Sequence, residues 1–150
     1  MRSHIKTFIA VALLLPLSCG NDDASSGSTD PLNGYWNLLN VSGGFAGVDV
    51  DYDHGSVSWQ FDTGTSMLRV ENVSIPNGPQ STFLPIPSGE YAYSVLEADG
   101  NKFLTIDGMP LYDNGEYGRI DITEAGDLII DQGQSSTSNA ADVYVLSFKR

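Results

Sequence analysis

The chain has 150 residues, of which 19 are acidic and 7 are basic, so its formal net charge is −12. This length is enough for one domain with a hydrophobic core. So strong a negative charge is repelled by phosphate backbones and by anionic membrane surfaces, which argues against a nucleic-acid partner and against electrostatic membrane binding.

The N-terminal residues 1–18 have the pattern of a signal peptide. Arg2 and Lys6 form a basic start, and the apolar run Phe8–Leu15 follows; it is too short for a membrane-spanning helix. The segment ends in Leu-Leu-Pro-Leu-Ser-Cys-Gly, which resembles a bacterial lipobox, where the cysteine is lipidated and becomes the first mature residue. Cys19 is the only cysteine of the chain. We therefore expect a lipoprotein, with an ordinary secretory protein as the alternative.

Residues 19–32 are rich in serine, glycine and aspartate, a composition typical of a flexible tether. Acyl chains on Cys19, palmitate among them, would supply roughly 0.8 kcal/mol of membrane affinity per buried methylene. We expect a lipid anchor in the outer membrane of the cell envelope, with the domain on the periplasmic face or exposed at the surface. The acidic residues that follow the cysteine resemble the surface-export signals of Bacteroidota lipoproteins.

From residue 33 onward, apolar and polar residues alternate with the period of β-strands. The clearest case is the segment in which Val57, Trp59 and Phe61 share one face. Turn-forming residues separate the alternating segments. We expect strands at 33–44, 56–62, 67–73, 89–97, 102–107, 117–123, 127–132 and 143–149, with a short edge strand at 109–112.

No window shows the periodicity of a helix, and residues 74–88 contain four prolines, which predicts a loop. About eight short strands joined by tight turns predict an all-β fold. Because the hairpins are sequential, we expect a small eight-stranded antiparallel up-and-down barrel over 33–150, whose closure removes exposed edges.

Short motifs recur along the strand-rich part of the chain. The first strand opens with the Gly-x-Trp of Gly34 and Trp36 and ends in Ser-Gly-Gly, and later segments read Trp-x-Phe, Leu-x-Ile-Asp-Gly and Tyr-x-Leu-x-Phe. Together they resemble the lipocalin-like domain of small Bacteroidota lipoproteins, over essentially 33–150. The resemblance implies a lipocalin-like barrel. It also implies that Lys149 or Arg150 packs over Trp36 as a cation–π contact and closes one end of the barrel.

Six aromatic side chains alternate toward the expected barrel interior. They are candidates for lining a ligand cavity, because such cavities are mostly apolar. They would equally suit a filled core, since a small eight-stranded barrel encloses little more space than its own side chains need. Both interpretations stay open. The six residues are Trp59, Phe61, Tyr91, Tyr93, Tyr144 and Phe148.

Three alternating carboxylates, Asp49, Asp51 and Asp53, form the most conspicuous polar cluster. An EF-hand loop needs glycine at its sixth position and glutamate at its twelfth, whereas here glycine is seventh and Gln60 is twelfth. We expect an acidic solvated loop, with a weak calcium site as the alternative. His54 is the only histidine after the leader, and no cysteine can join it, so an ordinary zinc site is not expected.

Catalysis is not expected, because the chain has no nucleophile elbow and no carboxylate pair that stands out from the other acids. We expect a monomeric, lipid-anchored lipoprotein without a cofactor, whose barrel binds a small apolar or amphipathic molecule. The alternative is a non-enzymatic interaction module with a filled barrel. Its loops at 45–55 and 74–88 would then contact an envelope protein or a surface glycan.

Overall fold

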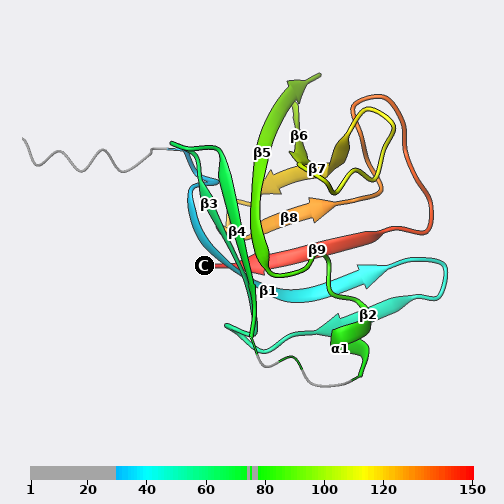
Figure 1. Ribbon diagram of the computed structural model, residues 1–150. Helices are drawn as coiled ribbons and strands as arrows, with labels where there is room; N and C mark the ends of the chain where they lie inside the picture. Colours follow the sequence, from blue (N-terminus) through cyan, green and yellow to red (C-terminus); the bar gives the residue numbers. More distant parts are fainter. Residues whose placement is uncertain (1–29, 74, 76–77) are drawn as a thin grey trace, which may run out of the picture.

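The computed structural model of the protein describes residues 30–73, 75 and 78–150. In these residues nine antiparallel strands and one short helix are found (Figure 1). The helix is α1 (Pro79–Thr82). The strands are β1 (Gly34–Gly43), β2 (Val48–Asp51), β3 (Val57–Asp62), β4 (Met67–Asn72), β5 (Gly89–Ala98), β6 (Asn101–Ile106), β7 (Glu116–Ile122), β8 (Leu128–Asp131) and β9 (Tyr144–Lys149).

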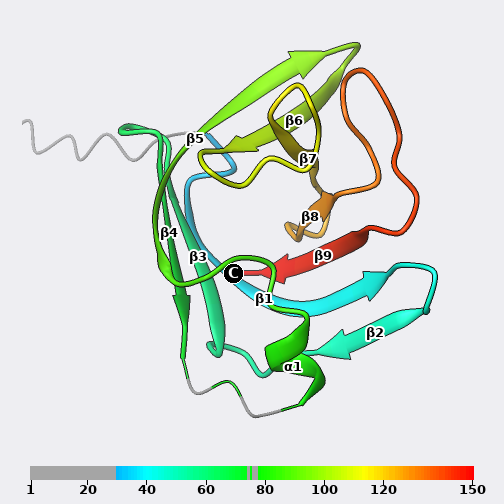
Figure 2. The same cartoon turned by 45° about the vertical axis from the view of Figure 1, so that its right-hand side comes forward.

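The sheet closes on itself because β1 pairs with β9 along one edge. Along its other edge, β1 pairs first with β3 and then with β2, so β2 and β3 together occupy one position of the barrel. The strands therefore form a closed barrel with eight positions that follow one another in chain order. Figure 2 shows them wrapped around a common interior. The predicted eight-stranded antiparallel up-and-down barrel is confirmed.

A β-bulge at Leu39 explains why β2 and β3 are separate strands. Its neighbours Leu38 and Asn40 pair with consecutive residues of β9, which leaves Leu39 without a partner in that described ladder. Its carbonyl instead accepts a hydrogen bond from the backbone N–H of Tyr52 at 2.8 Å. The extra residue shifts the alternation, so Leu38 and Val41 are both buried in the core. Such a bulge bends its strand, and the opposing strand breaks at this point.

Strand β2 corrects one prediction, because residues 48–51 were expected to belong to a solvated loop. The segment is a strand because Val50 is buried and pairs with Val41 of β1. With only four residues, its alternation is too short to recognise among the surrounding aspartates. The charged residues of this segment lie on the exposed face of a strand rather than in a loop.

The expected edge strand at 109–112 is also wrong. The backbone N–H groups of Leu111 and Tyr112 both donate to the carbonyl of Glu116, at 3.0 and 3.2 Å. These local bonds form a turn and leave no ladder for a strand. The proline-rich segment contains the single-turn helix α1, which lies beside β2 (Figures 1 and 2). One turn is too short to give a helical sequence pattern.

The two ends of the barrel differ. We call one the closed end: it carries the tight turns after β3, β5 and β7, together with the first described residues and the C-terminus. We call the other the open end: it carries the connections after β1, β4, β6 and β8. At the open end, the connections after β4, β6 and β8 are long enough to build walls above the barrel core.

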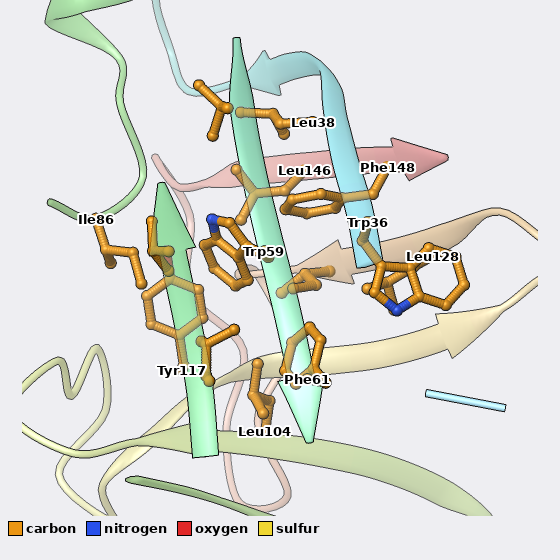
Figure 3. Packing of buried hydrophobic residues seen from close by; sticks show 14 of the residues in the cluster. Trp36, Leu38, Trp59, Phe61, Ile86, Leu104, Tyr117, Leu128, Leu146 and Phe148 are labelled. Atoms are coloured by element: carbon orange, nitrogen blue, oxygen red, sulfur yellow. The ribbon is translucent and has the colours of Figure 1, made fainter. Parts of the chain in front are cut away.

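Side chains fill the middle of the barrel, with Trp59 at their centre (Figure 3). The ring centroid of Trp59 lies 5.0 Å from that of Phe148 and 6.1 Å from those of Phe61 and Tyr117. All four rings are buried, and each buried side chain of this size contributes roughly 1.5–3 kcal/mol. Leu32, which falls in the segment expected to be a tether, also belongs to this core.

Candidate functional site

The closed end is built around Trp36. Its indole is fully buried, and Nε1 donates a hydrogen bond to the carbonyl of Leu32 at 2.8 Å. The guanidinium carbon of Arg150 lies 4.5 Å from the centre of the indole, and Nη2 donates to the carbonyl of Pro31. Gly34 has φ of +117°, and a Cβ there would lie 3.6 Å from the Arg150 guanidinium. These contacts attach the N-terminal segment to the barrel and cover Trp36.

Of the two basic residues that the resemblance offered for this position, Arg150 is the one that lies over the tryptophan. The Lys149 ammonium lies 3.9 Å from a carboxylate oxygen of Asp127, and both side chains reach solvent. An exposed pair of this kind contributes little stability, whereas a guanidinium over an indole contributes about 0.5–2 kcal/mol. The closed end therefore has a structural role.

Four of the six candidate cavity residues pack against one another instead of around a space. Trp59, Phe61 and Phe148 are fully buried, and Tyr93 lies edge-on to Phe61 with ring centroids 5.1 Å apart. None of the four lines either of the pockets described below. Burial, with smaller contributions from two nearby aspartates, raises the pKa of the Tyr93 hydroxyl to about 12. The hydroxyl therefore stays protonated at neutral pH.

The other two candidate residues lie apart from this core. Tyr91 is half-buried, and its hydroxyl donates to the carbonyl of Pro87 at 3.0 Å. Tyr144 stands at the open end with its ring 5.8 Å from that of Phe83. Of the six, Tyr144 is the one that lines a described pocket.

Two of the three carboxylates of the acidic cluster meet at one amide nitrogen, and the third lies apart from them. The side-chain amide of Asn40 donates to Asp49 at 2.8 Å and to Asp51 at 2.9 Å, on the exposed face of β2. Asp53 lies in the following turn, where its carbonyl accepts a hydrogen bond from Ser56 at 2.7 Å. Across residues 30–73, 75 and 78–150, no group of three histidine, cysteine or acidic side chains is placed to hold a metal ion.

A pocket of about 510 Å³ opens at the open end. We call it the mouth pocket. Its volume falls within the range usual for small-molecule sites. Its walls come from the connection between α1 and β5, the connection between β6 and β7, and the start of β9. The main apolar contributors are Phe83, Leu84, Ile86, Met109, Leu111 and Tyr144.

The proline-rich segment supplies one wall because side chains of the barrel hold it in place. The side-chain amide of Asn72 donates to the carbonyl of Ile86 at 3.0 Å, and its backbone N–H donates to Ser88 Oγ at 2.9 Å. The hydroxyl of Tyr52 donates to the carbonyl of Gln80 at 3.0 Å. A segment without strand structure is thereby fixed across the opening, with its apolar residues turned inward.

A second β-bulge brings Tyr117 into the mouth pocket. Its neighbours Glu116 and Gly118 pair with consecutive residues of β6, so Tyr117 is the extra residue of the described ladder. Gly118 has φ of +153°, and a Cβ there would lie 2.7 Å from the carbonyl oxygen of Asp131. Glycine is therefore needed at this close approach. Bulges of this kind re-aim a side chain.

The Tyr117 side chain is 2 % exposed and lines the mouth pocket. Its hydroxyl forms no hydrogen bond of good geometry within the described residues, although the Gln132 side chain lies near enough to interact with it. Burial raises the pKa of the Tyr117 hydroxyl well above its ordinary value, and the nearby Gln132 side chain offsets only part of that rise. Gln132 is itself buried and lines the same pocket.

Sequence reasoning missed Tyr117 because the alternation set by Ile120 and Ile122 assigns it to the outer face of its strand. The bulge reverses that assignment. One feature of the sequence could have indicated this bulge: Gly118 directly follows an aromatic residue inside a predicted strand. A glycine at such a position often marks a bulge.

The mouth pocket has an acidic residue and no basic residue in its described lining. Of its described lining residues, Asp142 carries a formal charge and none is cationic. One carboxylate oxygen of Asp142 accepts the backbone N–H of Phe45 at 2.8 Å, which joins two connections at the rim. The Phe45 side chain is 84 % exposed.

A further pocket, of about 590 Å³, lies at the closed end between residues 30–32 and strands β5 to β7. Its lining mixes acidic and basic side chains, among them Glu97, Lys102 and Arg119. The Lys102 ammonium lies 3.4 Å from a carboxylate oxygen of Glu97. Five of its twelve lining residues are charged, against one of fourteen in the mouth pocket, so the mouth pocket is the better candidate for an apolar ligand.

No protein-family model, curated protein or solved structure matches the chain. The structure shows a closed eight-stranded antiparallel barrel, which is consistent with a lipocalin-like fold. In the part of the chain that the structure describes, no helix combines the length and apolar character needed to cross a membrane.

Proposed function

We propose that the protein is a lipid-anchored lipoprotein of the cell envelope that binds a small apolar or amphipathic molecule in the mouth pocket. The observation that supports this proposal is an apolar pocket of about 510 Å³ above a barrel core that is already filled. The ligand sits at the opening, where Phe83, Leu84 and Met109 meet, rather than around Trp59. The motifs that resemble lipocalin-like Bacteroidota lipoproteins support the same proposal.

The first described residues and the mouth pocket lie at opposite ends of the barrel. The chain reaches the barrel through Pro31 and Leu32, which pack at the closed end beside Trp36. A lipid on Cys19 would therefore hold the closed end nearer to the membrane. The mouth pocket would then open toward the surrounding solution, where a ligand or its donor protein can reach it.

Replacement of Cys19 by alanine is expected to move the protein from the membrane fraction to the soluble fraction. The acidic barrel has no other strong attraction to an anionic surface, and the acyl chains supply the affinity. Fractionation of cells that express the full chain measures this, with Ser25→Ala as a control that keeps the cysteine. A Cys19→Ala protein that stays with the membrane contradicts the anchor.

Replacement of Leu84 by aspartate is expected to weaken the binding of an apolar ligand about tenfold or more. A carboxylate in an apolar wall costs well over the 1.4 kcal/mol that corresponds to a tenfold change. Saturable binding of Nile red to the purified protein, and its displacement by 1-decanol, measures the effect. Leu96→Asp is the matched control, because Leu96 lies exposed on β5 and does not line the mouth pocket.

Two results of that titration would contradict ligand binding at the mouth pocket. One is a wild-type protein that shows no saturable binding, and the other is equal weakening by Leu84→Asp and Leu96→Asp. The second candidate function, an interaction module with a filled barrel, would then be favoured. It has one observation in its support: Phe45 and Leu111 expose apolar side chains at the rim of the open end, 84 % and 47 % respectively.

A further inference from the structure

We infer that the ligand of the mouth pocket carries an uncharged polar head group, such as a hydroxyl or a carboxamide, which hydrogen-bonds to Tyr117 and Gln132. This inference rests on the proposed function and names the ligand class more closely. It makes Tyr117 a residue that determines specificity, whereas the apolar walls provide most of the contact area.

The first support is the unpaired hydroxyl of Tyr117. Buried polar groups in folded proteins nearly always have a hydrogen-bond partner, since leaving one without a partner costs free energy. Phenylalanine would supply the same ring without that cost. The side chain nevertheless lines the mouth pocket, with no partner for its hydroxyl among the described residues. A ligand atom in the pocket would provide the missing partner.

The second support is the way in which the backbone places this side chain. Tyr117 is the extra residue of a β-bulge, and Gly118 permits the close approach to β8 that the bulge requires. Regular alternation would have turned the tyrosine out to solvent. Trp59, whose ring lies 6.1 Å from that of Tyr117, also has an unpaired Nε1 donor. Of the three buried polar atoms without partners in the described residues, two therefore belong to neighbouring rings, and of these two residues Tyr117 lines the mouth pocket.

The third support concerns charge. A tyrosine hydroxyl and a glutamine amide can each donate and accept, so they complement a hydroxyl or a carboxamide. An anionic head would meet no cation among the described lining residues and would face Asp142. A cationic head would have to lose its hydration beside Tyr117, which is costly for a charge without a buried counter-ion. An uncharged head group fits these surroundings best.

The test compares four ligands of equal chain length at pH 8: decanamide, 1-decanol, decanoate and decylammonium. Their affinities are measured by displacement of Nile red from the wild type and from Tyr117→Phe. We expect decanamide and 1-decanol to bind about tenfold or more tightly than decanoate, a difference of 1.4 kcal/mol or more. Tyr117→Phe should remove most of this preference. Leu96→Asp, which lies outside the mouth pocket, should leave both the preference and Nile red binding unchanged.

Thermal unfolding of the ligand-free proteins distinguishes a binding role of Tyr117 from a purely structural role. If the hydroxyl only stabilised the fold, its removal would lower the midpoint of unfolding. Because its hydroxyl is unpaired, Tyr117→Phe should raise the midpoint of unfolding while it weakens decanamide binding. The matched control is Tyr91→Phe, which removes a hydroxyl that already donates to Pro87 and does not line the pocket. It should lower the midpoint and leave the ligand preference intact.

Several outcomes would overturn the inference. If decanoate or decylammonium binds best, the head group is charged, and the proposed function still stands. If Tyr117→Phe keeps the preference or lowers the midpoint, the hydroxyl does not recognise the ligand. If none of the four ligands and no Nile red binds, the proposed function fails, and the inference fails with it.

Discussion

Replacement of Trp59 by alanine is expected to lower the free energy of unfolding by about 3–5 kcal/mol, the usual cost of truncating a large buried aromatic residue. Trp59 is fully buried, and its ring packs against those of Phe61, Tyr117 and Phe148. Its Nε1 has no partner in the described residues, so the loss comes from packing and not from a hydrogen bond. Urea denaturation followed by circular dichroism measures it.

The matched control for this substitution is Tyr35→Ala. Tyr35 lies on β1 beside the same strand pair, but its side chain is 60 % exposed. Its replacement should change the free energy of unfolding by no more than about 0.5 kcal/mol. A loss below about 1 kcal/mol for Trp59→Ala would mean that this indole borders a space rather than a filled core. That result would contradict the filled interior and would move the ligand site to the centre of the barrel.

The second large effect is expected for Gly118→Ala, which should lower the free energy of unfolding by about 2–4 kcal/mol. A Cβ at this position would meet the backbone carbonyl of Asp131 at 2.7 Å, and neither atom can move without shifting its strand. The strained φ of +153° adds to the cost. Because the bulge also aims Tyr117, the same variant should bind decanamide more weakly than the wild type.

Gly126→Ala separates the cost of the positive φ from the cost of the close contact between β7 and β8. Gly126 has φ of +83°, but no atom lies within 4 Å of the position that its Cβ would occupy. This variant should lose about 1–2 kcal/mol from backbone strain alone and should bind decanamide normally. Equal losses for the two glycine variants would show that the close approach of β7 to β8 is not needed.

The closed barrel could be predicted from the sequence because strand alternation and turn residues act locally. The segment that contains Val57, Trp59 and Phe61 needs no tertiary information to be recognised as half-buried. The cation at the closed end could also be expected, from a resemblance, and Arg150 lies over Trp36 in the structure.

The bulges could not be predicted from the sequence in the same way. At Leu39 and Tyr117, one extra residue changes which side chains face inward, and pairing with a distant strand decides where it sits. The alternation therefore misses β2 and turns Tyr117 to the wrong face. Both of these differences depend on long-range hydrogen bonds, which a single-sequence pattern does not contain.

The mouth pocket was missed for a related reason. Its apolar wall comes largely from the proline-rich segment, which has no regular pattern and is fixed by Tyr52 and Asn72. Alternation correctly turned Trp59 and Phe148 inward, but it cannot tell whether inward side chains touch each other or leave a space between them. Side-chain volumes summed over the whole barrel decide that.

The most direct test of ligand binding at the mouth is a titration with 1-decanol, followed by NMR of ¹³C-methyl-labelled methionine. The barrel offers two reporters, since Met109 lines the mouth pocket and Met67 lies at the closed end. We predict that the Met109 methyl resonance shifts to saturation while that of Met67 stays in place. A shift of Met67 without Met109, or no shift of either at saturating 1-decanol, would contradict a ligand site at the mouth of the barrel.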